Sequence, residues 1–107
     1  LQAGYDAVGQ DGARYQVKGC RLTVANKSTQ LSAIRNLERD FFDQLAAVVY
    51  DSNLIVLYAA LIPLDVVKHL GRFTAHTNSH TLLFRRCVLD EPGVVDITDR
   101  VVEAVNA

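Results

Sequence analysis

Two apolar runs separated by three polar residues constrain the fold of this 107-residue chain more than any other feature. The runs cover residues 41–50 and 54–62, and the turn sequence Asp-Ser-Asn occupies residues 51–53. Both runs are rich in residues that favour strands, and so short a turn joins antiparallel neighbours. The near-continuous apolar character of residues 41–50 also indicates burial on both faces of that strand. We therefore predict that the two runs pair as adjacent antiparallel strands.

A second pair of strands is predicted at the start of the chain, where residues 3–9 and 13–20 flank an Asp-Gly turn. A loop over residues 10–12 would end on Gly12, and glycine suits the left-handed conformation that closes a three-residue hairpin loop. The alternative is a two-residue loop, which shifts the pairing register by one position. That shift would change which side chains share a face.

The three-residue loop gathers three polar side chains on one face of this hairpin. Asp6 lies opposite Gln16 in that register, and Lys18 follows two residues later on the same face. The two-residue loop would set Asp6 opposite Val17 instead. The other face of the favoured register is apolar and carries Tyr5, Ala7, Tyr15 and Val17. Because this choice keeps the apolar side chains together, we favour it and expect the apolar face to pack on the core.

The remaining sequence predicts helices alternating with strands. Ser28 can cap a helix, Pro63 can open another, and Gly71 can end it. We expect helices over residues 28–37, 64–70 and 98–104, a polar loop over residues 74–80, and a strand over residues 81–88. The predicted fold class is α/β (α+β), with a mixed central sheet flanked by helices in a single domain of residues 1–107.

Composition limits the partners and the compartment. The net charge is −1, so an anionic partner would have to meet a local patch rather than a basic surface. Cys20 and Cys87 are too few for a disulfide scaffold, and we expect reduced thiols in a cytoplasmic protein, with one disulfide as the alternative. The apolar stretch at residues 54–64 is about half the length that crosses a membrane, so no membrane partner is expected.

The polar trio has the chemistry that phosphodiester hydrolysis requires. A carboxylate from Asp6, with the Gln16 amide or the Val17 backbone carbonyl, offers the hard oxygen ligands that Mg²⁺ prefers. Lys18 can orient a water molecule or stabilise charge that develops on phosphate. The alternative interpretation is an edge hairpin whose polar face is solvated.

The sequence also resembles a known nuclease family. Asp6 followed by "YQVK" at residues 15–18 is similar to the motif of the PD-(D/E)XK superfamily, the restriction-endonuclease-like fold. That motif has an Asp on one strand, then Glu, Asp or Gln, any residue, and Lys on the next strand, and the Gln resembles the Mrr-type variant. The predicted order of strand, strand, helix and strand over residues 3–50 resembles the core of the family. The likeness extends to about residue 70.

This resemblance implies a Mg²⁺-dependent DNA endonuclease of restriction or defence type, with Mn²⁺ as a substitute metal and a homodimer as a partner arrangement. The implied catalytic residues are Asp6, Gln16 and Lys18, and the implied metal ligands are Asp6, Gln16 and Val17. The implied DNA contacts are Lys27, Ser28, Gln30, Arg35 and Asn78. Members of the family usually have a helix before the first strand, which is expected upstream of Leu1 if the chain is a fragment and is missing if the chain is complete.

Two other classes of protein remain open. The domain could keep the nuclease fold and bind DNA without cutting it, or it could be a structural domain unrelated to nucleases. His76 and His80 add a further alternative, a histidine-pair metal site, although the intervening Thr, Asn and Ser disfavour the helix that such a pair needs. An ordinary polar loop is the simpler interpretation of that stretch.

Overall fold

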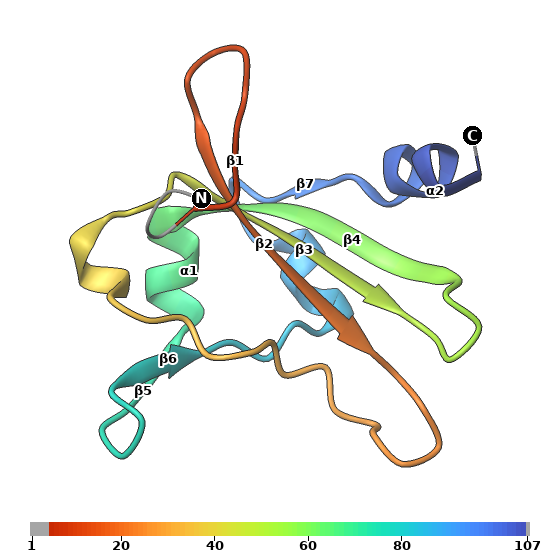
Figure 1. The fold of residues 1–107 in the computed structure, drawn as a ribbon, viewed down its shortest axis with the longest axis horizontal. Helices are drawn as coiled ribbons and strands as arrows, with labels where there is room; N and C mark the ends of the chain where they lie inside the picture. The colour runs from red at the N-terminus through yellow and green to blue at the C-terminus, as the bar shows by residue number, and fades with distance from the viewer. Residues whose placement is uncertain (1–4, 107) are drawn as a thin grey trace.

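The computed structural model describes residues 5–106 and folds them around one mixed sheet (Figure 1). The strands in chain order are β1 (Ala7–Val8), β2 (Arg14–Arg21), β3 (Gln44–Tyr50), β4 (Val56–Pro63), β5 (Arg72–Thr74), β6 (Ser79–Thr81) and β7 (Val95–Asp96). The helices are α1 (Leu64–Leu70), α2 (Thr98–Asn106) and the 3₁₀ turns η1 (Leu37–Arg39) and η2 (Arg86–Asp90). Residues 3 and 4 of the predicted first strand lie outside the described residues.

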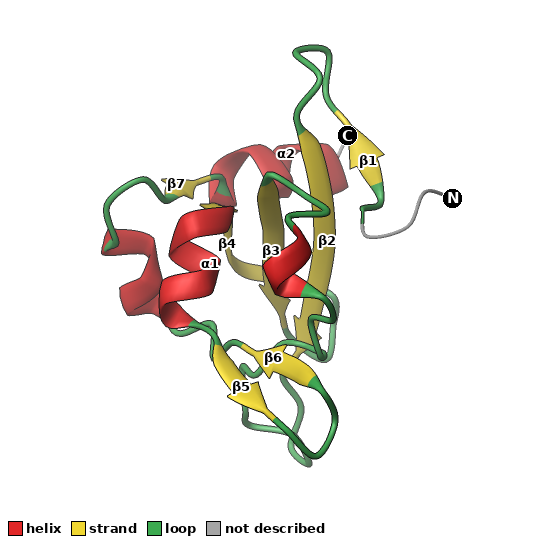
Figure 2. Ribbon diagram, turned by 90° about the vertical axis from the view of Figure 1, so that its left-hand side faces the viewer, coloured by secondary structure: helices red, strands yellow, loops and turns green. Residues whose placement is uncertain are grey.

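The main sheet has the strand order β1-β2-β3-β4-β7, and β5 and β6 form a separate hairpin. β2 and β3 run parallel, whereas the other neighbouring strands are antiparallel. α1 and α2 lie on opposite sides of the strands (Figure 2). The predicted fold class, a mixed sheet with helices packed against it, is confirmed. Of the helices in the described part of the chain, none has the length and apolar character that crossing a membrane requires.

The predicted pairing of residues 41–50 with residues 54–62 is confirmed by β3 and β4, where Ala47 lies opposite Ala60. β4 begins later than predicted because the chain is still turning at Leu54, whose φ is 64° and whose N–H donates to the carbonyl of Asp51. The strand ends at Pro63, and α1 follows at once over the predicted range of residues 64–70.

The core lies on one face of the sheet. Leu45, Ala47 and Val49 of β3 are fully buried there, while alternate residues of the same strand are only half-buried. Val67 of α1 and Phe84, from the segment after β6, pack against this core face. The prediction of burial on both faces therefore holds fully for one face of β3 and partly for the other.

The predicted register of the opening hairpin is confirmed. Ala7 lies opposite Tyr15, and the Gly9 N–H donates to the Ala13 carbonyl at 2.8 Å, which leaves a three-residue loop. Gly12 has a φ of +85°, the left-handed conformation that the loop requires. The hairpin projects beyond the rest of the sheet (Figure 1).

The predicted packing of that hairpin is wrong, because its apolar face is not the core face. Val17 is 51% exposed, and Ala7 is exposed as well. The parallel register sets Gln16 beside Leu45 and Cys20 beside Val49, and both β3 residues point into the core. The polar face of β2 therefore lies on the core side of the sheet. The reason is that β2 pairs with β3, whose alternate residues are fully buried on that side.

The predicted helix over residues 28–37 is also wrong. Residues 28–36, which we call the crossing segment, form no helix but two isolated bridges, at Gln30 and Ile34, and end at Asn36 in the left-handed conformation before η1. Leu31 N–H donates to the Leu82 carbonyl at 3.0 Å, and Ile34 and His80 exchange two hydrogen bonds of 2.8 Å. Leu31, Ile34 and Leu37 are nevertheless buried as predicted. Their spacing of three residues fits an extended chain with three residues per turn as well as a helix, so the spacing alone did not decide the conformation.

The chain after α1 departs from prediction in two places. The predicted loop over residues 74–80 is a turn between β5 and β6, and the predicted strand over residues 81–88 continues as strand only to Thr81 before η2 forms. Leu83 still pairs with Gln30 in an isolated bridge. The short edge strand β7 was not predicted.

Candidate functional site

Asp6 lies at the outer edge of β2. Its Oδ2 accepts a hydrogen bond of 2.8 Å from the Val17 N–H, while its own N–H donates to the Tyr15 carbonyl. The regular pairing of β1 with β2 stops at Ala7. Beyond it, the Asp6 carboxylate accepts the Val17 N–H in place of a backbone carbonyl. The side chain is exposed, which leaves this edge accessible from solvent.

The Val17 carbonyl points to the same edge as the Asp6 carboxylate. Backbone groups alternate sides along a strand, and the N–H of one residue points to the same side as its own carbonyl. The Leu22 N–H donates to Tyr50 of β3, so even-numbered residues of β2 direct their backbone groups toward β3. Val17 therefore directs both of its backbone groups outward, toward Asp6.

Gln16 follows Tyr15, the partner of Ala7, and pairs with Leu45 of β3. The confirmed register sets it on the face that leads into the core, and its side chain is half-buried. The Asp6 side chain thus comes from the residue just before β1, and the Gln16 side chain comes from β2.

Lys18 follows on the same face, and its amine is held by the crossing segment. Its Nζ donates to the Ser32 hydroxyl at 2.9 Å and to the Ala33 carbonyl at 3.1 Å. Burial lowers the pKa of the Lys18 amine, and the charge on Asp6 partly opposes that shift. The effect of Asp6 on this pKa means that the two charges are close enough to interact.

The residues that hold Lys18 were not among the predicted site residues. Ser32 and Ala33 fell within the predicted helix, where a serine on the solvent side carried no signal. Their contact with Lys18 depends on the extended path of the crossing segment over β2, and hydrogen bonds to residues about 50 positions away fix that path.

Three of the predicted DNA contacts lie in or just before the crossing segment. Lys27, Ser28 and Gln30 are all exposed, near the end of β2 that is distant from Asp6. The Ser28 hydroxyl accepts the Gln30 N–H at 3.2 Å, and the Ser28 carbonyl lies 3.2 Å from Cys20 Sγ. The Ser28 hydroxyl thus accepts a local backbone hydrogen bond, but the predicted helix cap is wrong because no helix follows.

Arg35 and Asn78 are brought together at the β5–β6 turn. Arg35 Nη1 donates to the Thr77 carbonyl at 2.9 Å, and Asn78 closes the turn with a φ of 47° and an N–H bond to Ala75. Both side chains are exposed. The predicted DNA contacts therefore form two groups, one at each end of the crossing segment.

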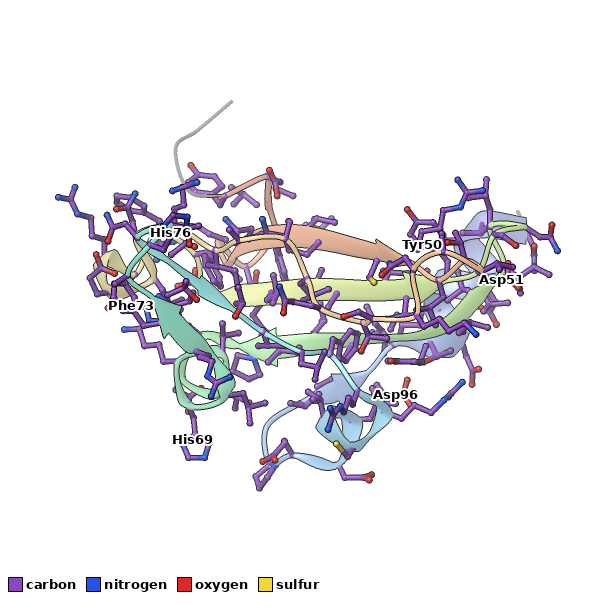
Figure 3. The ribbon with its side chains drawn as sticks, turned by 90° about the horizontal axis from the view of Figure 1, so that it is seen from below. Tyr50, Asp51, His69, Phe73, His76 and Asp96 are labelled. Carbon is purple, nitrogen blue, oxygen red and sulfur yellow. The ribbon has the colours of Figure 1, made fainter. Side chains whose placement is uncertain are left out.

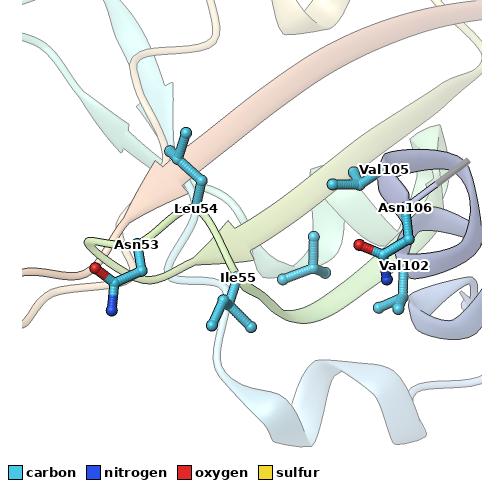
Figure 4. Close-up of a pocket in the computed structure, with 7 residues that line it drawn as sticks. Asn53, Leu54, Ile55, Val102, Val105 and Asn106 are labelled. Carbon is cyan, nitrogen blue, oxygen red and sulfur yellow. The ribbon is translucent and has the colours of Figure 1, made fainter.

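Two pockets of the structure lie away from the candidate site. One of about 550 Å³ lies between the β3–β4 turn and α2, and its walls are mainly apolar (Figure 4). A second, of about 220 Å³, is bounded by Leu37, Glu38, Lys68 and His80. Neither includes Asp6 or Lys18, so the candidate site is an open strand edge rather than a cavity.

Within residues 5–106, no group of three or more His, Cys, Asp and Glu side chains could hold a metal ion. The two cysteines are free thiols, Cys20 buried and Cys87 exposed.

A comparison with protein-family models and with curated proteins finds no match for the chain. The resemblance to PD-(D/E)XK nucleases therefore rests on the motif residues, because residues 28–36 do not form the helix that the predicted order of the elements requires.

Proposed function

We propose that this protein is a metal-dependent DNA endonuclease of restriction or defence type, similar to the PD-(D/E)XK superfamily. The observation that carries the proposal is the 2.8 Å hydrogen bond from the Val17 N–H to Asp6 Oδ2. It brings a carboxylate and an outward-pointing backbone carbonyl to one accessible strand edge, and Lys18 follows on the same strand. That combination is the one the nuclease motif requires.

The donor atoms fit Mg²⁺ or Mn²⁺ in type. The Asp6 carboxylate, the Val17 carbonyl and the Gln16 amide are hard oxygen donors, and these are the ligands that Mg²⁺ takes, usually together with several waters. A bound ion of this kind supplies Lewis-acid activation of phosphate and of water. A set with one carboxylate predicts weaker binding than a set with two.

The chain's own residues supply the remaining chemistry. The ammonium group of Lys18 can stabilise negative charge on a phosphate at the edge of β2, and Ser32 and Ala33 restrict its position. Burial lowers the pKa of this amine relative to that of an ordinary lysine.

A second candidate function is a nuclease-like module that binds DNA without cleaving it. The Lys18 amine favours this alternative, because it donates to Ser32 and Ala33 on the core side of the sheet rather than toward the Asp6 edge. The amide at position 16, in place of a second carboxylate, favours it too.

Nicking of supercoiled plasmid in Mg²⁺ or Mn²⁺ tests the proposal. Asp6→Asn and Lys18→Ala should each lower the rate at least about 100-fold, as the loss of a group that stabilises transition-state charge does. Asp11→Asn is the matched control, because Asp11 is an acid of the same hairpin that only accepts the Ala13 N–H, a role that Asn can keep. Gln16→Glu should raise both metal affinity and the rate.

Plasmid binding without cleavage, in the wild type and in Gln16→Glu alike, would select the non-cleaving module. Cleavage that survives Asp6→Asn would show that Asp6 is not a catalytic residue, even if the protein is a nuclease. Direct titration of Mn²⁺ into wild-type and Asp6→Asn protein separates loss of metal from loss of chemistry.

A homodimer and a cytoplasmic location belong to the same proposal. Cutting both strands of a duplex requires two edges of this kind, which a pair of chains would supply. Sedimentation in the presence of a short duplex, with and without Mg²⁺, would detect the pair.

A further inference from the structure

One segment of the chain is segregated in charge from the rest. Residues 66–89 contain all three histidines and four of the eleven Lys and Arg residues but none of the twelve acidic residues. The chain as a whole has a net charge of −1. Because this segment contains basic residues and no acidic ones, the rest of the chain has a negative net charge. The β5–β6 hairpin lies at the centre of the segment.

Phe73 of β5 is an exposed aromatic residue within this segment. It is 56% exposed, and among the described residues it is the one aromatic side chain that is mostly open to solvent. It lies across the hairpin from His80, and the two ring centroids are 5.2 Å apart with the planes tilted by 58°. The cross-strand pair fixes the ring in place, so an outer face remains available for stacking.

Arg35 and Arg72, the two arginines at this hairpin, form no ion pair with an acid of the described chain. The ion pairs among residues 5–106 are Arg14 with Asp43 and Lys68 with Asp40, so Arg35 and Arg72 take part in neither. Arg72 directly precedes Phe73 and is exposed, and Arg35 reaches the turn from the crossing segment. Phe73 and His76 lie at the opposite end of the molecule from Tyr50 and Asp51 (Figure 3).

The hairpin is rigid enough to present these groups. Asn78 takes the left-handed turn position, which Asn tolerates better than most residues, and Thr77 Oγ1 and Ser79 Oγ are 2.6 Å apart. His80 pairs with Ile34, and the two residues before Ile34 hold the Lys18 amine. One continuous stretch of backbone therefore connects the candidate catalytic lysine to the hairpin.

We propose that the β5–β6 hairpin binds single-stranded or locally unpaired nucleic acid, with a base stacked on Phe73 and phosphates contacted by Arg35 and Arg72. An exposed aromatic ring among unpaired cations is the arrangement by which proteins bind single strands, because every base offers a face for stacking and every nucleotide carries a phosphate. This inference rests on the proposed function in its choice of nucleic acid as partner, and it adds the substrate form. It needs neither the metal nor cleavage.

Fluorescence anisotropy of a labelled 12-nucleotide single strand and of its duplex, both in EDTA, tests the hairpin without the metal site. Phe73→Ala should weaken single-strand binding by about 5- to 100-fold, the range found for losing one stacked base. Phe73→Tyr should remain within about twofold of the wild type, because it keeps the ring. Arg72→Ala should weaken binding and reduce its salt dependence. Ile55→Ala, at a residue 58% exposed and far along the chain, is the matched control and should have no effect.

A second measurement guards against misfolded variants. Ultraviolet cross-linking of a single strand that carries thiouridine should attach it to the tryptic peptide of residues 73–85 in the wild-type protein.

Single-strand binding that survives Phe73→Ala, or binding to the duplex alone, would overturn the hairpin assignment and leave the endonuclease proposal standing. Binding to polyglutamate or to phosphatidylserine vesicles in place of both oligonucleotides, lost in Phe73→Ala, would assign the hairpin to an acidic peptide or a membrane surface. Loss of plasmid nicking in Asp6→Asn concerns the endonuclease proposal alone, because the hairpin inference needs neither the metal nor cleavage.

Discussion

The opening hairpin and the crossing segment are both extended, and they meet at Lys18, but their conformations have different origins. The hairpin closes through the Gly9–Ala13 hydrogen bond, between residues four apart in the chain. The crossing segment is held by Leu82 and His80, which lie about 50 residues further along. The residues of a turn determine its conformation locally, whereas the conformation of an extended segment depends on a partner that is distant in the sequence.

This difference matters for the candidate site, because the site combines both regions. Asp6 and Val17 are brought together by the hairpin alone. The position of the Lys18 amine depends on Ser32 and Ala33 and thus on the long-range contacts. Metal binding and catalysis should therefore respond differently to changes in the two regions.

Replacing Leu31 with Asp should have the largest effect, because the side chain is 1% exposed and the crossing segment depends on it. Burial of an unpaired charge costs several kcal/mol, which is comparable with the whole stability of a domain this size. We expect the domain to unfold at room temperature, as measured by circular dichroism. Gln30→Asp, at the exposed neighbour, should melt close to the wild type. An unchanged melting temperature in Leu31→Asp would show that the segment is not packed as described.

Gly12→Ala tests the local half of the comparison. With a φ of +85°, an L-residue at this position costs about 1–2 kcal/mol, although no atom lies within 4 Å of the added Cβ. The loss should appear as a lower denaturant midpoint with an unchanged m-value. Gly12→Asn should lose less, since Asn enters the left-handed region more readily. Equal stability of the Ala variant would mean that the loop has a different register.

Ser32→Ala should change the free energy of unfolding in opposite directions for a helix and for an extended chain over residues 28–36. A helix would gain about 0.5 kcal/mol from alanine at an exposed position. The extended segment should lose about 0.5–1 kcal/mol instead, because the Lys18 amine loses an acceptor. Chemical denaturation measures the sign directly. Ser32→Thr keeps the hydroxyl and should restore most of the loss.

The smallest effect concerns the ion pair that ties the base of the hairpin to β3. Hydrogen bonds from the Arg14 side chain and backbone lower the pKa of the Asp43 carboxyl. A lowered pKa in the folded state stabilises the fold above the ordinary Asp value of 3.8 and ceases to do so as the pH falls through the folded value. Melting temperatures between pH 7 and pH 2 should therefore fall less in Asp43→Asn than in the wild type. High salt should shrink the difference, because both groups are exposed.

Sequence patterns predicted the local parts of the site well. The Gly12 turn and the apolar alternation predicted the register that pairs Ala7 with Tyr15, and Pro63 and Gly71 predicted the bounds of α1. Those signals act over a few residues and need no distant partner. Burial of Leu31 and Ile34 was also predicted, because apolar side chains are removed from water in either conformation.

Only the tertiary structure decided which side of β2 faces the core and how its polar residues are satisfied. An isolated hairpin with Tyr15 and Val17 on one face should bury that face, yet parallel pairing with β3 turns Gln16, Lys18 and Cys20 to the buried side. The sheet gains more by burying the continuous apolar side of β3 and β4 than it loses by half-burying Lys18, whose amine finds two acceptors in the crossing segment. Pairing across the sheet thus outweighed the pattern of a single strand, and it brought the lysine beside the two residues that hold it.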